Sequence, residues 1–182
     1  MLRILDFIFS LLGLLFGSPV LLLIYLIGLL DTGSPVFRQV RVGRNKMPFT
    51  LVKFRTMSVD TASVASHLAS TASITRVGGF LRKTKLDELP QLWNVLKGEM
   101  SLVGPRPGLF NQEELTKARE REGVFLVRPG ITGLAQVSDI DMSTPELLAK
   151  TDAKMISEIS LANYFKFILQ TVVGRGAGDR VK

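Results

Sequence analysis

Two adjacent carboxylates, Asp87 and Glu88, are the residues of this sequence best suited to chemistry on a phosphate. They stand at the expected start of a helix and follow a basic run from Arg76 to Lys85. A helix N-terminus carries partial positive charge and unbonded N–H groups, and nearby cations strengthen this field. Such a field keeps carboxylates ionised and attracts phosphate. Paired carboxylates also suit Mg²⁺, which binds one or two of them together with substrate phosphates.

The same pair also has a structural interpretation. Asp87 stands three positions before Pro90, which is a capping sequence, because proline is tolerated in the first turn of a helix. Glu88 would then only favour the helix dipole. Local physics therefore leaves two interpretations open, a reactive site or a helix cap.

Five basic residues are candidates for binding the phosphates of a substrate. Arg106 and Arg128 each lie in a loop rich in proline and glycine, which can hold an arginine with little loss of entropy. Arginine suits bidentate contacts with phosphate. With Lys53, Arg55 and Arg82 they could form one basin near the carboxylates. The alternative for each is a surface salt bridge, which contributes little.

A small α+β domain, mostly helical, is expected to position these groups. Residues 36–42 and 49–57 read as the two strands of a hairpin. Residues 86–98 predict a helix with Leu89, Leu92, Trp93 and Leu96 on its apolar face, ended by Gly98. Further helices are predicted over 113–122, 145–157 and 161–173. The last has an apolar stripe that fits either the core or a membrane interface.

The first thirty residues predict a membrane segment. No charged residue occurs from Phe7 to Leu30, a run longer than the roughly 20 apolar residues that cross a bilayer. Ser18 and Pro19 interrupt it and predict a bend, which leaves a kinked spanning helix and a re-entrant helix-break-helix both open. Basic residues after the run place the rest of the chain in the cytoplasm. We therefore divide the chain into residues 1–30, a membrane hairpin, and 31–182, a catalytic domain.

Composition limits the class of function. The net charge of +7 implies polyanionic partners, which could be nucleic acid, anionic lipid or phosphorylated small molecules. The chain has no cysteine, so it has no disulfide and no thiol nucleophile. Its single histidine, His67, lies in a polar stretch that does not resemble a catalytic triad.

Several long motifs resemble the monotopic bacterial sugar transferases, which are small polyprenyl-phosphate phosphoglycosyl transferases. The motifs occur in the family's order and cover nearly the whole chain. They are Ser34-Pro-Val-Phe-Arg-Gln-Val-Arg-Val-Gly43, Lys53-Phe-Arg-Thr-Met57, the run from Leu86 to Ser101, Gly104-Pro-Arg-Pro107 and Arg128-Pro-Gly-Ile-Thr-Gly-Leu-Ala-Gln-Val137.

The resemblance implies transfer of a phosphosugar from a UDP-sugar to polyprenyl phosphate, with release of UMP. It implies that Asp87 is the nucleophile of a covalent intermediate and contributes to binding a required Mg²⁺, with Glu88 as its catalytic partner. Arg106 and Arg128 match the family's phosphate-side arginines. Ser18 and Pro19 match the break of its re-entrant helix.

The resemblance also implies a setting. The expected location is the bacterial inner membrane, with the catalytic domain on the cytoplasmic face. Membrane lipids are expected partners, a homodimer is possible and no nucleic acid is expected. The sequence departs from many relatives at Ser138-Asp-Ile-Asp141, where they carry Asn-Gly-Arg, so the sugar stays open. The alternative function is a non-catalytic membrane scaffold that binds anionic lipid or phosphorylated ligands.

Overall fold

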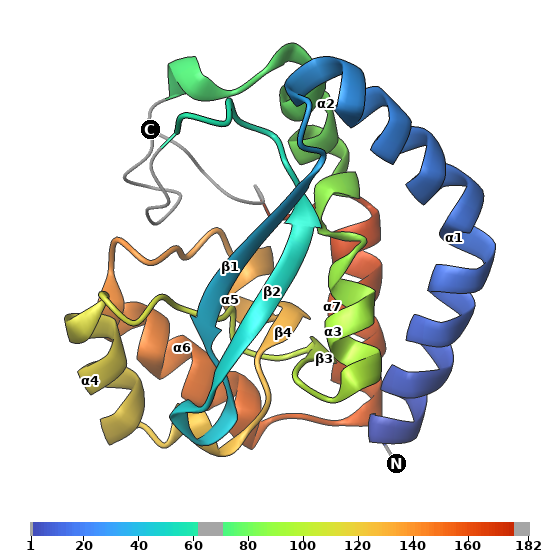
Figure 1. Cartoon of the computed structure of the whole chain (residues 1–182). Coiled ribbons are helices and arrows are strands. Elements are labelled where there is room, and N and C mark those ends of the chain that lie inside the picture. The colour runs from blue at the N-terminus through green and yellow to red at the C-terminus, as the bar shows by residue number, and fades with distance from the viewer. Residues whose placement is uncertain (1, 62–70, 177–182) are drawn as a thin grey trace.

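The computed structural model describes residues 2–61 and 71–176, and His67 lies outside them. In this part of the chain the fold is α+β and mostly helical, as predicted, with two small sheets (Figure 1). The main elements are α1 (Leu2–Thr32), β1 (Val36–Val42), β2 (Pro48–Phe54), α2 (Arg76–Thr84), the 3₁₀ turn η4 (Leu86–Glu88), α3 (Gln91–Lys97), β3 (Ser101–Val103), α4 (Glu113–Arg121), β4 (Gly130–Thr132), α5 (Leu134–Val137), α6 (Pro145–Ser157) and α7 (Leu161–Val172).

The first helix, α1, is long and apolar enough to cross a membrane, and it continues through Pro19. The predicted helix-break-helix is therefore one bowed helix here (Figure 1). Proline at 19 cannot donate a hydrogen bond to the carbonyl of Leu15. The Ser18 hydroxyl donates to that same carbonyl at 2.8 Å and replaces the missing donor. The predicted back-bond of Ser18 is thus confirmed, and it explains why the helix is not interrupted.

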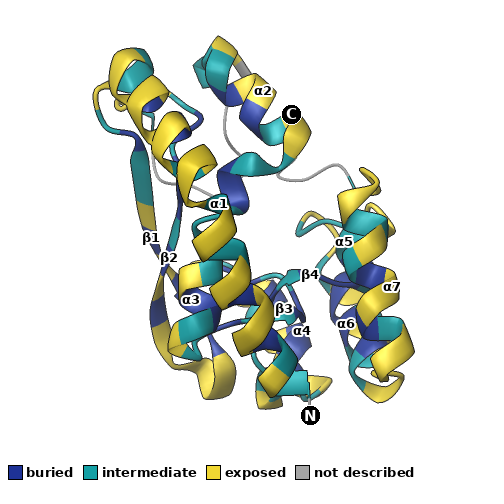
Figure 2. Ribbon diagram, turned by 90° about the vertical axis from the view of Figure 1, so that its right-hand side faces the viewer, coloured by how far each residue is buried: buried dark blue, intermediate teal, exposed yellow. Residues whose placement is uncertain are grey.

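Both ends of α1 are held by the rest of the chain. Near its start, the Asp6 carboxylate is 2% exposed and accepts hydrogen bonds from the Ser101 hydroxyl, the Leu102 amide and the Tyr164 hydroxyl at 2.9–3.0 Å. Near its end, the Thr75 hydroxyl donates to Asp31 at 2.6 Å. The middle of the helix is mostly exposed (Figure 2). The helix therefore lies along the domain with its apolar outer face uncovered.

The hairpin formed by β1 and β2 is antiparallel, as predicted, with Val36 opposite Phe54 and Val42 opposite Pro48. A second, parallel pair joins β3 to β4, with Ser101 opposite Gly130. The sequence analysis did not predict this pair. The two backbone segments approach so closely here that a Cβ on Gly130 would lie 2.0 Å from the backbone nitrogen of Gly104. Glycine at 130 is therefore required by the close contact that follows β3.

Two predicted apolar faces differ from the structure. On α3 the core-facing residues are Asn94 and Val95, both 0% exposed, whereas Trp93 is 53% exposed. On α7 the buried residues are Tyr164 and Phe167. In the predicted stripe the core interpretation is confirmed for Tyr164 and Ile168, whereas Leu169 at 61% and Val172 at 77% exposed lie outside the core.

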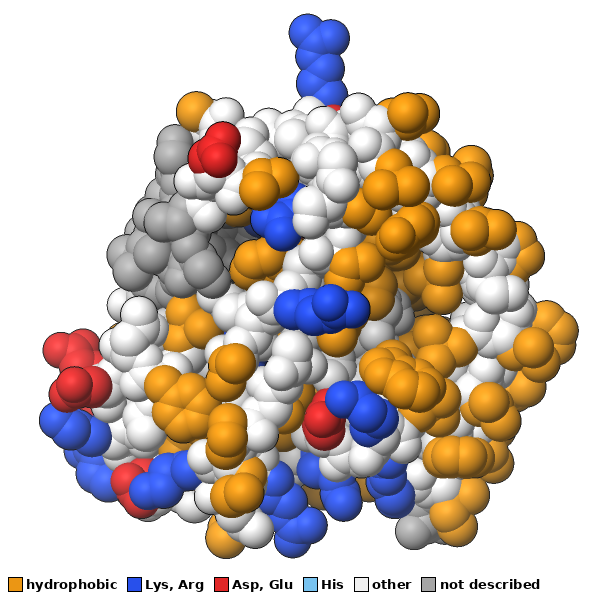
Figure 3. Space-filling model, in the orientation of Figure 1, with side chains coloured by type: hydrophobic (Ala, Val, Ile, Leu, Met, Phe, Trp, Pro, Cys, Tyr) orange, Lys and Arg blue, Asp and Glu red, His pale blue; other side chains and the backbone are white. Residues whose placement is uncertain are grey.

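The exposed apolar faces of α1 and α7 are in contact. The ring of Phe9 on α1 packs edge-on against the ring of Phe165 on α7, with centroids 5.9 Å apart. Figure 3 shows hydrophobic side chains gathered along the α1 edge of the molecule. An uncovered apolar surface of this extent is typical of a membrane or protein interface.

Candidate active site

Asp87 and Glu88 lie in η4, a single turn between α2 and α3, and are 3% and 7% exposed. Lys85 ends α2 in the left-handed conformation (φ 58°), so the chain changes direction just before the pair. Leu86 then packs against the buried cluster of Ile24, Phe54 and Leu81. The turn at Lys85 and the packing of Leu86 thus fix the position of the carboxylate pair that follows.

The structure corrects the capping interpretation. Helix α3 begins at Gln91, its N-cap residue is Pro90, and no side chain caps it. The residue before η4 is Lys85, which also makes no side-chain cap. Neither Asp87 nor Glu88 therefore acts as an N-cap, and their burial needs another explanation.

Part of that explanation is Arg106, which the structure brings to the pair as predicted. Its Nη2 lies 2.7 Å from Oε1 of Glu88, in a contact where both side chains are largely shielded from water. Such a charge-assisted bond is stronger than one between neutral groups. The Arg106 guanidinium therefore balances one of two adjacent buried carboxylates.

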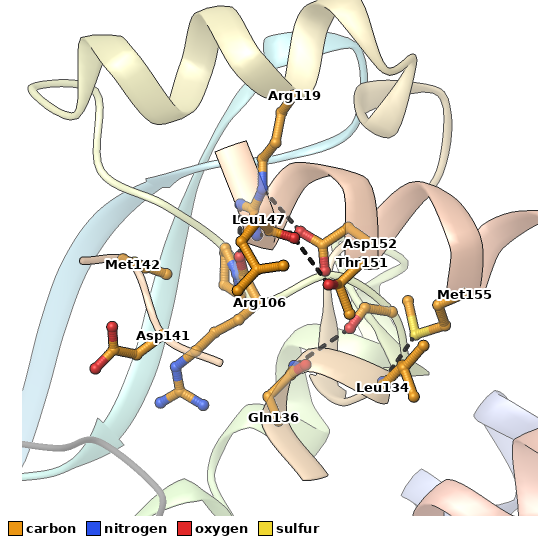
Figure 4. Close-up of polar contacts among 12 residues, drawn as sticks. Arg106, Arg119, Leu134, Gln136, Asp141, Met142, Leu147, Thr151, Asp152 and Met155 are labelled. Atoms are coloured by element: carbon orange, nitrogen blue, oxygen red, sulfur yellow. Dashed lines mark hydrogen bonds and ion pairs between the residues drawn. The ribbon is translucent and has the colours of Figure 1, made fainter. Parts of the chain in front are cut away.

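A buried ion pair holds the Arg106 loop in place (Figure 4). Arg119 on α4 donates to Oδ2 of Asp152 on α6 at 2.7 and 3.0 Å, and its Nη1 donates to the backbone carbonyl of Arg106 at 2.8 Å. Asp152 is 0% exposed, and burial raises the pKa of its carboxyl although Arg119 opposes the shift. The Asp152–Arg119 ion pair thus holds the backbone of Arg106 in place. Arg119 was missed in the sequence because it occupies a helix that reads as a charged surface.

The strand β2 and the helix α2 pack against η4 and bring the other predicted cations to this side of the domain. Lys53 is 7% exposed. Its Nζ and the guanidinium of Arg55 lie 5.7 and 5.5 Å from the centre of the Phe37 ring. The Nε of Arg82 donates to the Thr56 hydroxyl at 2.8 Å. These contacts fix the three cations on or next to the elements that pack against η4.

Lys85 is a further cation of the site to which the sequence analysis gave no separate role. Burial lowers the pKa of its ammonium group, the Glu88 carboxylate opposes this shift, and Arg106 adds to it. Its Nζ donates to the carbonyl of Arg175 at 2.5 Å. Asp139, in the segment where the sequence departs from many relatives, also acts on this ammonium group. That segment therefore lies close to the carboxylate pair.

A cavity of about 310 Å³ opens beside Glu88 and Lys85. Apart from these two charged residues, its walls are mainly apolar and come from α3, β3, β4 and α7. They include Leu89, Leu92, Ile131 and Ile168. The cavity therefore has an acidic and a basic side chain in an otherwise mainly apolar lining.

Arg128 is not brought to the carboxylate pair. Its Nε donates at 2.7 Å to the carbonyl of Gly98, the residue that ends α3, whereas Glu88 lies before the start of α3. The seven residues of α3 lie between the two and span about 10 Å at 1.5 Å per residue. The predicted grouping of Arg128 with Arg106 around one phosphate site is therefore not seen.

The carboxylate pair fits a role in binding Mg²⁺. The described residues contain no cluster of three or more acidic or histidine side chains that could enclose a metal ion. Mg²⁺ does not need such a cluster, since it binds one or two carboxylates together with water and substrate phosphates. The Asp87 and Glu88 carboxylates, which lie side by side in η4, are the groups that could contribute to such a site.

Sequence comparisons place this geometry in context. A family model described as bacterial sugar transferase matches residues 1–175. A UDP-glucose:undecaprenyl-phosphate glucose-1-phosphate transferase of Caulobacter vibrioides is 41% identical over 180 residues, which cover 93% of this chain and 67% of that protein. A UDP-galactose-lipid carrier transferase of Erwinia amylovora is 37% identical over 172 residues, covering 85% of this chain and 36% of that protein.

An exopolysaccharide production protein of Rhizobium leguminosarum is 37% identical over 179 residues, covering 92% of this chain and 88% of that protein. The chain thus spans about a third of the Erwinia protein but most of the Rhizobium protein. With a family model that covers nearly its whole length, the chain belongs to the bacterial sugar transferase family.

Proposed function

We propose that this protein transfers a phosphosugar from a UDP-sugar to polyprenyl phosphate and releases UMP. The observation that carries the proposal is the buried pair Asp87 and Glu88, of which Glu88 contacts Arg106 and lines a mainly apolar cavity together with Lys85. The cations suit a diphosphate donor, and the apolar walls suit a lipid acceptor. The names of the Caulobacter and Erwinia relatives support both substrate classes.

In the first step an Asp87 carboxylate oxygen attacks the phosphorus that bears the sugar. A bond forms between this oxygen and phosphorus, the bond to the bridging oxygen breaks, and UMP leaves with the electron pair. A carboxylate nucleophile divides one difficult displacement into two easier ones. Arg106 holds the neighbouring Glu88 carboxylate, so the charge of the pair is partly balanced before the phosphates enter.

In the second step a phosphate oxygen of the lipid attacks the same phosphorus, and the bond to Asp87 breaks. The carboxylate is restored and polyprenyl diphosphosugar is released. The apolar walls beside Glu88 would receive the first isoprene units and exclude water from the acyl-phosphate. Mg²⁺ bound by Asp87 and the diphosphate would neutralise charge on the leaving UMP.

The membrane arrangement supports a helix that enters and leaves on one side. A straight helix of 31 residues would be about 46 Å long, enough to cross a bilayer. However, Asp6 near one end and Asp31 near the other both bond to the same domain. If α1 crossed the bilayer, its two ends would lie on opposite sides, and one set of these contacts with the domain would break. We therefore infer a re-entrant α1, with the domain on the cytoplasmic face of the bacterial inner membrane.

Topology can be tested with a cysteine at position 2, because the chain has none of its own. In intact cells a membrane-impermeant thiol reagent should not label this cysteine, whereas it should after the membrane is opened. A cysteine at the exposed residue Arg121 is the matched control for the cytoplasmic domain. Labelling of position 2 alone in intact cells would contradict the re-entrant arrangement.

The reaction is tested by UMP release from a panel of UDP-sugars with polyprenyl phosphate and Mg²⁺. Wild type should release UMP with at least one sugar, and Asp87→Asn should lose at least about a thousandfold in rate, as for other covalent nucleophiles. Release by wild type that persists fully in Asp87→Asn would remove Asp87 as nucleophile. No release with any sugar would favour a non-catalytic scaffold.

A further inference from the structure

Arg128 lines a second cavity, of about 320 Å³, on the opposite face of the β3–β4 pair. Successive side chains of a strand point to opposite faces. Leu102 accordingly lines the cavity beside Glu88, whereas its neighbours Ser101 and Val103 line the second one. No residue lines both cavities. The second cavity is therefore separate from the carboxylate pair.

Three guanidinium groups border this second cavity, and each is anchored on a backbone carbonyl. Arg3 donates from Nη2 to Val95 at 2.6 Å, Arg44 from Nε to Leu126 at 3.0 Å, and Arg128 from Nε to Gly98 at 2.7 Å. Neutral carbonyls hold the Arg44 and Arg128 guanidinium groups in place without cancelling their charge, whereas Arg3 also lies 3.7 Å from the Asp6 carboxylate. The planar fork of arginine suits phosphate oxygens, which it can bind with two donors.

The acidic residue in the lining is Asp6, and its hydrogen-bonding capacity is used within the protein. It accepts from Ser101, Leu102 and Tyr164 and lies 3.7 Å from Arg3. The lining therefore carries three cations against one engaged carboxylate. This balance favours an anionic ligand.

The position of the cavity identifies the source of that anion. Arg3 lies at the start of α1, four residues before its uncharged apolar run begins at Phe7, which is near the level of lipid headgroups if α1 is inserted. The rim also exposes apolar side chains, with Leu126 at 70% and Ile159 at 38% exposed. Met155 contributes an apolar wall deeper inside. A phosphate joined to acyl chains matches both the cations and the apolar surface.

We propose that this cavity binds the phosphate headgroup of an anionic phospholipid of the surrounding membrane. The bound lipid would rest against Arg44, Arg128 and Arg3 and would attach the start of α1 and the loop at Leu126 to the bilayer surface. The site is distinct from the one that receives the polyprenyl acceptor in the proposed reaction. It needs α1 to be inserted in a membrane, but it does not need turnover.

The test uses the purified full chain in detergent, with retained lipids counted by native mass spectrometry. Phosphatidylglycerol and phosphatidylcholine with identical acyl chains are the probes. Wild type should retain one phosphatidylglycerol in preference to phosphatidylcholine. Arg44→Gln and Arg128→Gln should each weaken retention about fivefold, the factor expected when one basic residue near an anionic headgroup is lost. Arg121→Gln, an exposed arginine on α4, is the matched control and should not change it.

Several outcomes would overturn the proposal. They are equal retention of phosphatidylcholine, unchanged retention in Arg44→Gln, and displacement of the lipid by excess inorganic phosphate or by polyprenyl phosphate. Because Arg44 is exposed, its substitution tests the site even if Arg128→Gln does not fold. The inactive Asp87→Asn chain should retain phosphatidylglycerol like wild type, so failure of this site is distinguishable from failure of the proposed reaction.

Discussion

The two faces of the β3–β4 pair carry the same kind of side chain in different surroundings. On one face Arg106 pairs with the Glu88 carboxylate, while on the other Arg128 donates to the neutral carbonyl of Gly98. Arg106 lies between two prolines and follows β3, while Arg128 directly precedes Pro129 and β4, and each of these strands has only three residues. The partner of each guanidinium, rather than its local sequence, distinguishes the two faces.

This difference suggests that the two faces of the β3–β4 pair have different functions. A cation that balances a buried carboxylate can prepare it for reaction, because the charge of the pair changes when a phosphate enters. A cation held by a carbonyl keeps its full charge and suits static binding. We expect substitutions on the first face to change turnover and those on the second to change attachment to lipid.

The largest effect is expected from Asp152→Ala, which would leave the buried guanidinium of Arg119 without its carboxylate. Breaking a buried pair from one side typically lowers the free energy of unfolding by about 3–5 kcal/mol. Glu146→Ala, which breaks an exposed pair with Arg121, should cost less than about 1 kcal/mol. Chemical denaturation in detergent measures both. A similar loss of unfolding free energy in the two variants would contradict the role of the Asp152–Arg119 pair in holding the Arg106 loop.

Next in size is Arg106→Gln, which removes the cation 2.7 Å from Glu88. Loss of a charge-assisted hydrogen bond worth about 1.5–3 kcal/mol should slow UMP release about 10- to 100-fold. Steady-state kinetics of UMP release give the rate, and Arg121→Gln serves as the control. A normal rate in Arg106→Gln would remove the distinction between the two faces.

The pH dependence of stability tests the second face. Burial raises the pKa of the Tyr164 hydroxyl, with the Asp6 carboxylate adding to the shift. The folded phenol therefore stays neutral while the unfolded one ionises near pH 10, so stability is retained below about pH 10 and falls above it. The slope from this group is at most about 1.4 kcal/mol per pH unit. Tyr164→Phe should flatten the decline seen in thermal unfolding, whereas Tyr25→Phe, at an exposed position, should not.

The smallest effect is expected from Arg128→Gln on turnover. Since Arg128 lies on the face away from the carboxylates, UMP release should change by no more than about twofold, the range of substitutions away from buried networks. The same assay as for Arg106→Gln applies. A loss as large as that of Arg106→Gln would mean that the two arginines serve one phosphate site after all.

Much of the fold followed from local patterns. The helix over 145–157 was predicted with its observed bounds, and the hairpin strands were predicted to within a few residues, because apolar periodicity and turn residues lie within the same short segment. The parallel β3–β4 pair was missed since three-residue strands leave no periodic signal. Trp93 was assigned to the core because an apolar side chain on a helix face looks the same whether it meets protein or lipid.

The candidate site was predictable to the level of residue type. Asp87, Glu88 and Arg106 were named from the sequence, and the structure brings Arg106 and Glu88 into contact. Arg128 was grouped with Arg106 because similar loops carry both, but sequence gives no sign of which face of a later sheet a loop will occupy. Asp6 was not considered, since its partners lie some 95 and 158 residues further along the chain.

The attachment of Asp6 also sets an order of events during synthesis. Asp6, at the start of α1, is synthesised 158 residues before Tyr164, which bonds to it. At the usual 5–20 residues per second this interval is roughly 8–30 seconds. Until Ser101 and Leu102 are made, some 95 residues after Asp6, the Asp6 carboxylate lacks these partners in the domain while α1 can rest in the membrane. The start of α1 thus completes its contacts only after the domain up to α7 has been made.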